Sequence, residues 1–401
     1  MRLARSRRDE TKEPWRPGGR HGPIVPERGD DPIPENGARP GDLGCKFTTM
    51  EGGAMKSTSV LWAVAVCGLL ATPSLTAGAD ASGYKVTKQF KLGGEGGWDD
   101  LTVDPDAHRL YVGRSTRLQV IDVDSGKVVG EIPNTPGIHA VALAPEFGRG
   151  FTSNGRDSSV TVFDLKTLAT VTRIPIDAQN PDAILYEPVS KRIFTFNGRS
   201  RNATAIDAAS DSVVGTVPLG GKPEAAVADG HGHVFVNLDD SSAVVGFDAR
   251  SLKTESRWPI APGEEPSGLA IDREHHRLFS GCGNQKMMVI DDESGKVVAD
   301  LPIGKGVDGT AFDPGTGLAF SSNGEGTLTV VREASPSKFE VVGNVTTQRG
   351  ARTLALDPKS HRIYLATASF GEPPAPTPDR PHPRPPMLPD SFVILVLERT
   401  P

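Results

Sequence analysis

Cysteine is scarce in this sequence: the chain of 401 residues contains only Cys45, Cys67 and Cys282. The first two precede the regularly patterned part of the chain, so Cys282 is alone there and no intramolecular disulfide framework can form in that part. We expect Cys282 to be a buried thiol, because the sequence offers no convincing histidine partner for a catalytic one. The fold must therefore be held together by its packed core.

Helical periodicity and an excess of positive charge are also lacking. No long run places apolar residues three and four positions apart, as an amphipathic helix requires. The formal net charge is −6, whereas a nucleic-acid-binding protein needs a basic face, so we expect no nucleic-acid partner. The 45 glycines and 34 prolines instead suit many short strands joined by turns.

The N-terminal part contains two segments that do not resemble a folded domain. Residues 1–54 have almost no apolar pattern, which indicates a disordered segment or an upstream extension that is not translated. Residues 55–79 have the parts of a secretory signal peptide: Lys56, an apolar run over 60–71, and Ala77-Gly-Ala79 for cleavage. They predict a periplasmic or secreted protein with no membrane span after cleavage. The alternative is an uncleaved anchor with a cytoplasmic tail.

A unit of about 42 residues then recurs seven times to the end of the chain. Each copy begins with a short apolar strand that ends near an acidic residue, as in Leu101-Thr-Val-Asp-Pro105. The residues that close these strands are 40 to 44 positions apart: Asp104, Ala144, Glu187, Asp229, Asp272, Asp313 and Asp357. Each copy has room for four strands, and seven such copies predict an all-β, seven-bladed β-propeller. The predicted domain covers 80–401, with blades at about 98–139, 140–181, 182–223, 224–266, 267–307, 308–350 and 351–400 plus 84–92.

The seventh copy differs from the others in two ways. It lacks a fourth strand, and an unpaired strand at 84–92 precedes the first copy. We predict that 84–92 completes blade 7 and closes the ring, which would leave no long sheet edge there. The seventh copy also carries a Pro-rich segment, 370–390, between its second and third strands. This segment is either a passive surface loop or an arm that covers the mouth or docks a partner.

The blade motifs resemble a known family. Arg109-Leu-Tyr-Val112 and the two Ser-Gly-Lys-Val-Val stretches at 125–129 and 294–298 are similar to repeats of the YVTN/YncE-like family of secreted bacterial seven-bladed β-propeller proteins. The resemblance covers roughly 84–400 and implies the fold, but the roles of family members are largely undefined. Single-stranded DNA binding is attributed to one branch, and this sequence lacks the basic, aromatic groove that such binding uses.

In a propeller, the residues that lead into the innermost strands surround one mouth of the central channel. We call these positions the mouth residues: Trp98, Asp99, Asp100, His139, Asp182, Glu224, Ser267, Asp308 and Arg352. Most are ionisable, which predicts a polar pocket for a small molecule or a protein partner. Asp182, Glu224 and Asp308 offer oxygen ligands suited to one Ca²⁺ or Mg²⁺ ion, and His139 extends the choice to transition metals. The alternative is a structural ring of strand caps.

Two further sets of side chains lie outside the mouth positions. Asn-Gly pairs at 154, 197 and 323 fall between second and third strands, where they predict tight turns, although an amide oxygen there could also face a ligand. Four histidines fall in the turns between first and second strands, at the opposite end of the channel from His139: His108, His275, His276 and His361.

These observations favour a monomeric binding or scaffold protein that uses the channel mouth. The alternative is a metal-dependent, lactonase-like hydrolase with one divalent cation at the central channel, which rests on analogy between folds. The sequence contains no nucleophile elbow, P-loop or His-Glu-x-x-His motif, and no Cys-x-x-Cys-His site for covalent haem. Catalytic residues therefore stay unassigned.

Overall fold

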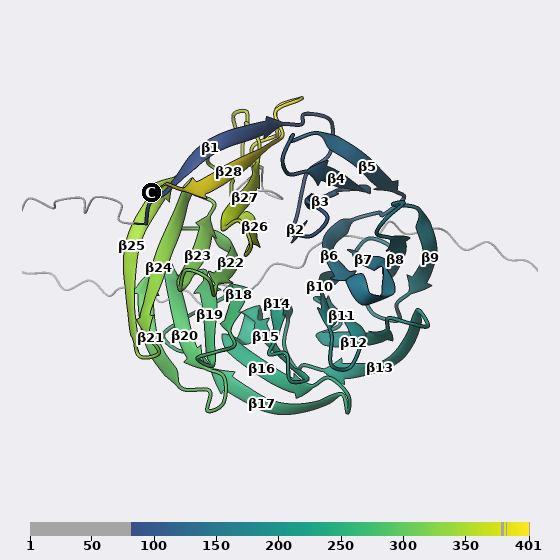
Figure 1. Cartoon of the computed structure of the whole chain (residues 1–401), viewed down its shortest axis with the longest axis vertical. Helices are drawn as coiled ribbons and strands as arrows, with labels where there is room; N and C mark the ends of the chain where they lie inside the picture. The colour runs from purple at the N-terminus through teal and green to yellow at the C-terminus, as the bar shows by residue number, and fades with distance from the viewer. Residues whose placement is uncertain (1–81, 378–380, 382, 401) are drawn as a thin grey trace, which may run out of the picture. The chain divides into compact units, whose positions relative to one another are not determined.

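The computed structural model describes residues 82–377, 381 and 383–400. In this part of the chain, seven four-stranded antiparallel sheets form a ring of blades (Figure 1). The predicted seven-bladed β-propeller is therefore confirmed. The predicted N-terminal extension, 1–54, and signal peptide, 55–79, lie outside the described residues. Across the described ranges, no helix is long and apolar enough to cross a membrane.

The first strand of each blade lies innermost, beside the first strands of the neighbouring blades (Figure 1). These seven strands are β2 (Leu101–Asp104), β6 (Ile138–Ala144), β10 (Pro181–Glu187), β14 (Pro223–Ala228), β18 (Pro266–Asp272), β22 (Val307–Asp313) and β26 (Thr353–Asp357). The fourth strands form the rim, and in most of them exposed residues dominate. They are β5 (Val128–Pro133), β9 (Thr170–Pro175), β13 (Ser212–Pro218), β17 (Lys253–Pro259), β21 (Val297–Pro302), β25 (Lys338–Thr346) and β1 (Tyr84–Lys91).

The second and third strands carry most of the core, because both faces of each are covered by neighbouring blades. Leu110, Tyr111 and Val112, for example, are consecutive and fully buried. The second strands are β3 (Arg109–Arg114), β7 (Arg149–Asn154), β11 (Arg192–Asn197), β15 (His233–Leu238), β19 (Arg277–Cys282), β23 (Leu318–Asn323) and β27 (Arg362–Thr367). The third strands are β4 (Arg117–Asp122), β8 (Ser159–Asp164), β12 (Asn202–Asp207), β16 (Ala243–Asp248), β20 (Lys286–Asp291), β24 (Thr327–Ser335) and β28 (Val393–Arg399). Cys282 is a buried free thiol, as the sequence predicts.

The acidic residue that ends most third strands has a structural role in the following turn. The Asp122 carboxylate accepts hydrogen bonds from the backbone N–H and the hydroxyl of Ser125, at 2.8 and 2.6 Å. Asp291 accepts the same pair from Ser294. These bonds to the charged form hold the pKa of Asp122 below its usual range. The repeated Asp-x-x-Ser spacing therefore builds turns, and these acids are committed to the scaffold.

The N-terminal strand closes the ring as predicted. β1 pairs antiparallel with β28, with Tyr84 opposite Arg399 and Lys91 opposite Val393 (Figure 1). β1 also contacts the first blade, because Phe90 packs on the turn at Gly126, where φ is +68°. A Cβ at Gly126 would lie 2.2 Å from the Phe90 ring, so the contact requires glycine. The strand thus joins the last blade to the first.

We expect a chain that begins at Gly93 to be much less stable than one that begins at Ser82. Loss of β1 exposes the edge of β28 and removes the buried Phe90, and such a loss costs several kcal/mol. Thermal unfolding followed by circular dichroism should show a Tm lower by about 10 °C or more. Equal melting of the two chains would contradict the closure of the ring by β1.

Candidate functional site

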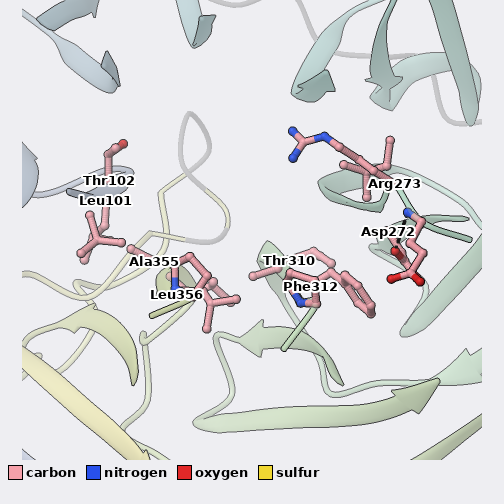
Figure 2. A pocket seen from close by; sticks show the side chains of 15 residues that line it. Leu101, Thr102, Asp272, Arg273, Thr310, Phe312, Ala355 and Leu356 are labelled. Atoms are coloured by element: carbon pink, nitrogen blue, oxygen red, sulfur yellow. Dashed lines mark hydrogen bonds between the residues drawn. The ribbon is translucent and has the colours of Figure 1, made fainter. Parts of the chain in front are cut away.

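Two cavities lie along the innermost strands, one toward each end. The cavity toward the strand ends has a volume of about 610 Å³, and its lining includes Leu101, Phe312 and Leu356 (Figure 2). The cavity at the strand starts has a volume of about 210 Å³ and is lined by seven of the nine mouth residues, all but Trp98 and Arg352. We call it the acidic cavity, because five carboxylates line it: Asp99, Asp100, Asp182, Glu224 and Asp308. The sequence prediction of a shared polar mouth is consistent with this placement.

Irregular strand pairing turns the mouth residues toward the channel. In blades 2 to 6 the register between first and second strand shifts at the start of the first strand, as between Pro181 and Ile184. The residues within or beside these shifts are His139, Asp182, Glu224, Ser267 and Asp308. A buried Pro, Ile or Val stands immediately before each of them and anchors the strand. A bulge of this kind redirects side chains, which explains how polar residues from five blades face one cavity.

Hydrogen bonds between blades fix the backbone at the mouth. The Ser153 hydroxyl of blade 2 donates to the carbonyl oxygen of Asp182 in blade 3. The Asn237 amide of blade 4 donates to the carbonyl oxygen of Ser267 in blade 5, at 3.1 Å. The backbone N–H of Asp100 donates to the carbonyl oxygen of His139, at 3.1 Å. Because each bond crosses from one blade to the next, the mouth residues are held in position by the whole ring.

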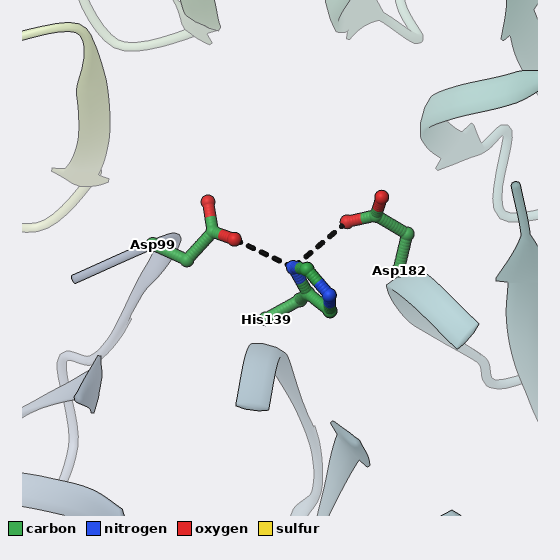
Figure 3. Close-up of side chains that lie close together, drawn as sticks. All are labelled: Asp99, His139 and Asp182. Atoms are coloured by element: carbon green, nitrogen blue, oxygen red, sulfur yellow. Dashed lines mark hydrogen bonds and ion pairs between the residues drawn. The ribbon is translucent and has the colours of Figure 1, made fainter. Parts of the chain in front are cut away.

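His139 lies between two carboxylates (Figure 3). Its Nδ1 is 2.6 Å from Asp99 Oδ2 and 3.3 Å from Asp182 Oδ1. Asn180, which the sequence analysis missed, donates its Nδ2 to Asp182 Oδ2 at 3.3 Å. Burial lowers the pKa of His139, but the hydrogen bond with Asp99 and the two negative charges outweigh this effect and raise it. The contacts with Asp99 and Asp182 therefore stabilise the imidazolium form of His139.

Asp100 has the least compensated charge in the acidic cavity. Its Oδ1 accepts the backbone N–H of Leu101 at 2.8 Å, and in the described part of the chain no Lys, Arg or His forms an ion pair with it. Water reaches Asp100 within the cavity, but the surrounding protein removes much of its solvation, and Asp99, Asp182 and Asp308 add repulsion. Desolvation is the main cause that raises the pKa of Asp100 to about 7, and repulsion by the three neighbouring aspartates adds to it.

The other two acids of the cavity are paired with basic residues. Lys222 Nζ is 2.6 Å from Glu224 Oε1 and 2.8 Å from Asp239 Oδ2. Desolvation still outweighs this contact and raises the pKa of Glu224 to about 7. Arg352 Nη1 is 2.9 Å from Asp308 Oδ2, and the pKa of Asp308 is raised by its burial. The cavity thus holds more carboxylates than neighbouring basic groups.

Not all predicted mouth residues line the cavity. Arg352 contacts it through Asp308, to which the Ser267 hydroxyl also donates at 2.9 Å. Trp98 lies outside the cavity lining: its ring packs 5.4 Å from Phe392 and 6.1 Å from Phe370, which begins the Pro-rich segment. Trp98 therefore joins blade 1 to the base of that segment. At that base, Phe370 and Met387 form an isolated antiparallel bridge.

The asparagines of the Asn-Gly pairs have structural partners inside their own blades. Asn154, Asn197 and Asn323 are fully buried at the ends of second strands. Asn154 Nδ2 donates to Ser159 Oγ and Thr161 Oγ1, at 3.1 and 2.9 Å, and the other two make equivalent bonds. These contacts fit the predicted turns and leave the amides pointing into the blades.

The residues around His139 fit a metal ion. Asp99, His139 and Asp182 each offer one ligand atom, and these atoms lie within 4.8 Å of one another. One imidazole nitrogen with two carboxylate oxygens is a donor set for a divalent transition metal such as Zn²⁺ or Mn²⁺. Ca²⁺ would need more oxygen ligands than these three residues supply. Binding would require His139 Nδ1 to lose its proton.

Comparisons with known proteins define the fold only. Neither models of protein families nor curated protein sequences give any match. Hydrazine synthase from Kuenenia stuttgartiensis is similar in structure, with a TM-score of 0.60 and 16% identity over 73% of this chain and 95% of that chain. U3-55K gives a TM-score of 0.63 at 11% identity, covering 79% and 99% of the two chains. The WD40 repeats of RRP9 give 0.63 at 12%, covering 79% and 97%. These similarities support a seven-bladed propeller.

We expect Asp100→Asn to stabilise the protein in a pH-dependent way. Because the folded-state pKa of Asp100 is raised to about 7, the folded protein binds its proton more tightly than the unfolded chain does. Wild-type stability therefore falls as pH rises from about 4 to about 7, and the variant lacks this loss. Its advantage in Tm should be absent near pH 4, grow with pH and level off above about 7. Water in the cavity limits the gain to the order of 1 kcal/mol.

The matched control is Asp177→Asn, which changes an exposed aspartate in the loop between β9 and β10. We expect its Tm to follow wild type at every pH. If the Tm of Asp100→Asn also equals that of wild type from pH 4 to pH 9, the surroundings of Asp100 do not destabilise its ionised carboxylate.

Proposed function

We propose that this protein is a binding protein whose acidic cavity takes up a divalent transition-metal ion through Asp99, His139 and Asp182. The observation that carries the proposal is the position of His139 Nδ1 between two carboxylates inside a cavity with further acids. A dication placed there would replace one proton and neutralise two charges that the fold brings together. The remaining acids of the cavity would contact water or other ligands of the ion.

The electrostatics of the cavity support a cation as the ligand. Burial raises the pKa values of Asp182, Glu224 and Asp308 as well as that of Asp100. The protein thus maintains acids whose ionised forms are unfavourable in this cavity, and raised carboxyl pKa values are characteristic of functional sites. A bound cation would lower these pKa values and recover the free energy that their desolvation costs. A neutral or anionic ligand would not.

The wider context of the proposal comes from the sequence. The blade motifs and the 55–79 segment favour a secreted or periplasmic propeller of the YVTN/YncE-like kind. Phe370, at the start of the Pro-rich segment 370–390, packs on Trp98, and this segment is the part of the chain that we propose contacts a protein partner. In this view the ring is a scaffold and the acidic cavity is its ligand site.

We expect wild-type protein to bind Zn²⁺ at this site and Asp182→Asn to bind it more than about tenfold more weakly there, because a charged ligand is lost. Isothermal titration calorimetry would measure both affinities. Affinity should rise by about tenfold per pH unit while His139 remains protonated, since the ion must displace that proton. Asp177→Asn is the control and should bind Zn²⁺ like wild type.

The same samples separate binding from hydrolysis. If metal-loaded wild type hydrolyses simple lactones and Asp182→Asn does not, the protein belongs among metal-dependent hydrolases. Unchanged Zn²⁺ binding in a His139→Ala, Asp182→Asn double variant would contradict the proposal that the ion occupies the acidic cavity.

A further inference from the structure

A second cluster of possible metal ligands lies between blades 5 and 6, toward the other end of the innermost strands. Asp272 ends β18, His275 lies in the turn that follows, and Glu333 lies on β24 of the next blade. His275 Nδ1 is 2.7 Å from Asp272 Oδ2 and 3.3 Å from Glu333 Oε1. The ligand atoms of the three residues lie within 4.8 Å of one another. Asp272 also lines the larger cavity (Figure 2).

Glu333 departs from the pattern of the other blades. In strand register, Arg277 pairs with Asp291 in blade 5, and Leu318 pairs with Arg332 in blade 6. Glu333 therefore occupies the position that follows the usual third-strand acid. In blades 1 to 4 this position holds an apolar residue that packs in the core: Val123, Leu165, Ala208 and Ala249. In blade 5 it holds Asp292, which pairs with His276 at 3.0 Å. A scaffold role does not require an acid at the position of Glu333.

The Glu333 carboxylate is buried without hydrogen bonds. Its side chain is 2% exposed, and neither oxygen accepts a hydrogen bond within the described ranges; its one ion-pair contact there is His275 Nδ1, 3.3 Å from Oε1. Arg277, the nearby basic residue, is held 2.6 Å from Asp291 instead. Burial, together with the adjacent Asp272, raises the pKa of Glu333 to about 7. A buried carboxylate in this state costs folding free energy that a bound cation would offset.

We propose that Asp272, His275 and Glu333 form a second binding site, for a divalent transition-metal ion such as Zn²⁺. An imidazole nitrogen and two carboxylate oxygens match the ligands that Zn²⁺ takes from proteins, and three protein ligands leave one position to water. His275 is 38% exposed on its side chain, so solvent reaches the site. The ion would take the place of the proton on His275 Nδ1. Since its ligands come from two blades, the ion would cross-link blade 5 to blade 6.

The experiment isolates this site from the acidic cavity. Full-length protein carrying His139→Ala and Asp182→Asn lacks the ligands proposed at the mouth and keeps the second cluster intact. Equilibrium dialysis against Zn²⁺, with the metal quantified by atomic absorption, should find one bound ion in this background and a Tm that rises with Zn²⁺. Adding Glu333→Gln should weaken binding more than about tenfold and remove the rise in Tm.

The control is His361→Ala in the same background. His361 Nδ1 is 2.7 Å from Asp313 Oδ2, which gives a similar His–Asp pair between blades without the third ligand. Zn²⁺ binding should survive this change. The proposal is overturned if the background variant binds no Zn²⁺ while folded, or if binding persists after Glu333→Gln.

A second substitution guards against misfolding. If Glu333→Gln fails to fold, His275→Ala serves in its place, because this exposed side chain can be removed without leaving a cavity. Failure of this proposal is distinguishable from failure of the proposed function, since Glu333→Gln in an otherwise wild-type chain should leave binding at the mouth unchanged.

Discussion

The pairing of β1 with β28 is the contact on which the rest of the molecule depends. Every other blade is built from strands that are neighbours in sequence, whereas this sheet joins residues more than 300 positions apart. Without it, blade 7 and blade 1 would lose their connection through Phe90 and the turn at Gly126. The acidic cavity exists only in the closed ring, because residues of all seven blades line it, Thr353 and Leu354 of blade 7 included.

Closure of the ring brings together charged groups that would lie far apart on separate sheets. Each blade contributes one or two polar groups near the start of its first strand, and each group alone would be solvated. Closure brings five carboxylates to one small space, where desolvation and repulsion raise the pKa values of Asp100, Asp182, Glu224 and Asp308. His139, Lys222 and Arg352 compensate only part of this charge. The uncompensated carboxylates therefore lower the stability of the closed ring near neutral pH, and the proposed cation would offset that loss.

The sequence predicted the fold in detail, because the blade repeat and its turn acids are local features. The period near 42 placed the blades, and the missing fourth strand of the last copy identified 84–92 as its completion. The site was predictable only as a set of positions around a ring. The bulges that turn His139 and Asp182 inward leave no mark in residue type, and the pairing of His139 with two particular carboxylates depends on the spacing of three blades.

Other contacts required three-dimensional information. Trp98 was expected at the mouth from its position in the repeat, but it packs on Phe370 and Phe392, which lie more than 270 residues later. The unusual position of Glu333 could in principle be recognised from the repeat, since blades 1 to 4 have an apolar residue there. Because Arg332 stands where the other third strands have an acid, the sequence alone does not align Glu333 with those apolar residues. The strand register does align them.

The antiparallel register at the closure also determines how the protein responds to mechanical force. Tyr84 and Arg399 lie opposite each other at one end of the β1–β28 pair, so tension applied to the two chain ends would load that end of the ladder first. The hydrogen bonds between β1 and β28 would then break one after another. When two strands are pulled along their axes, by contrast, all the bonds carry the force together. The ring would thus open first between β1 and β28 when its ends are pulled.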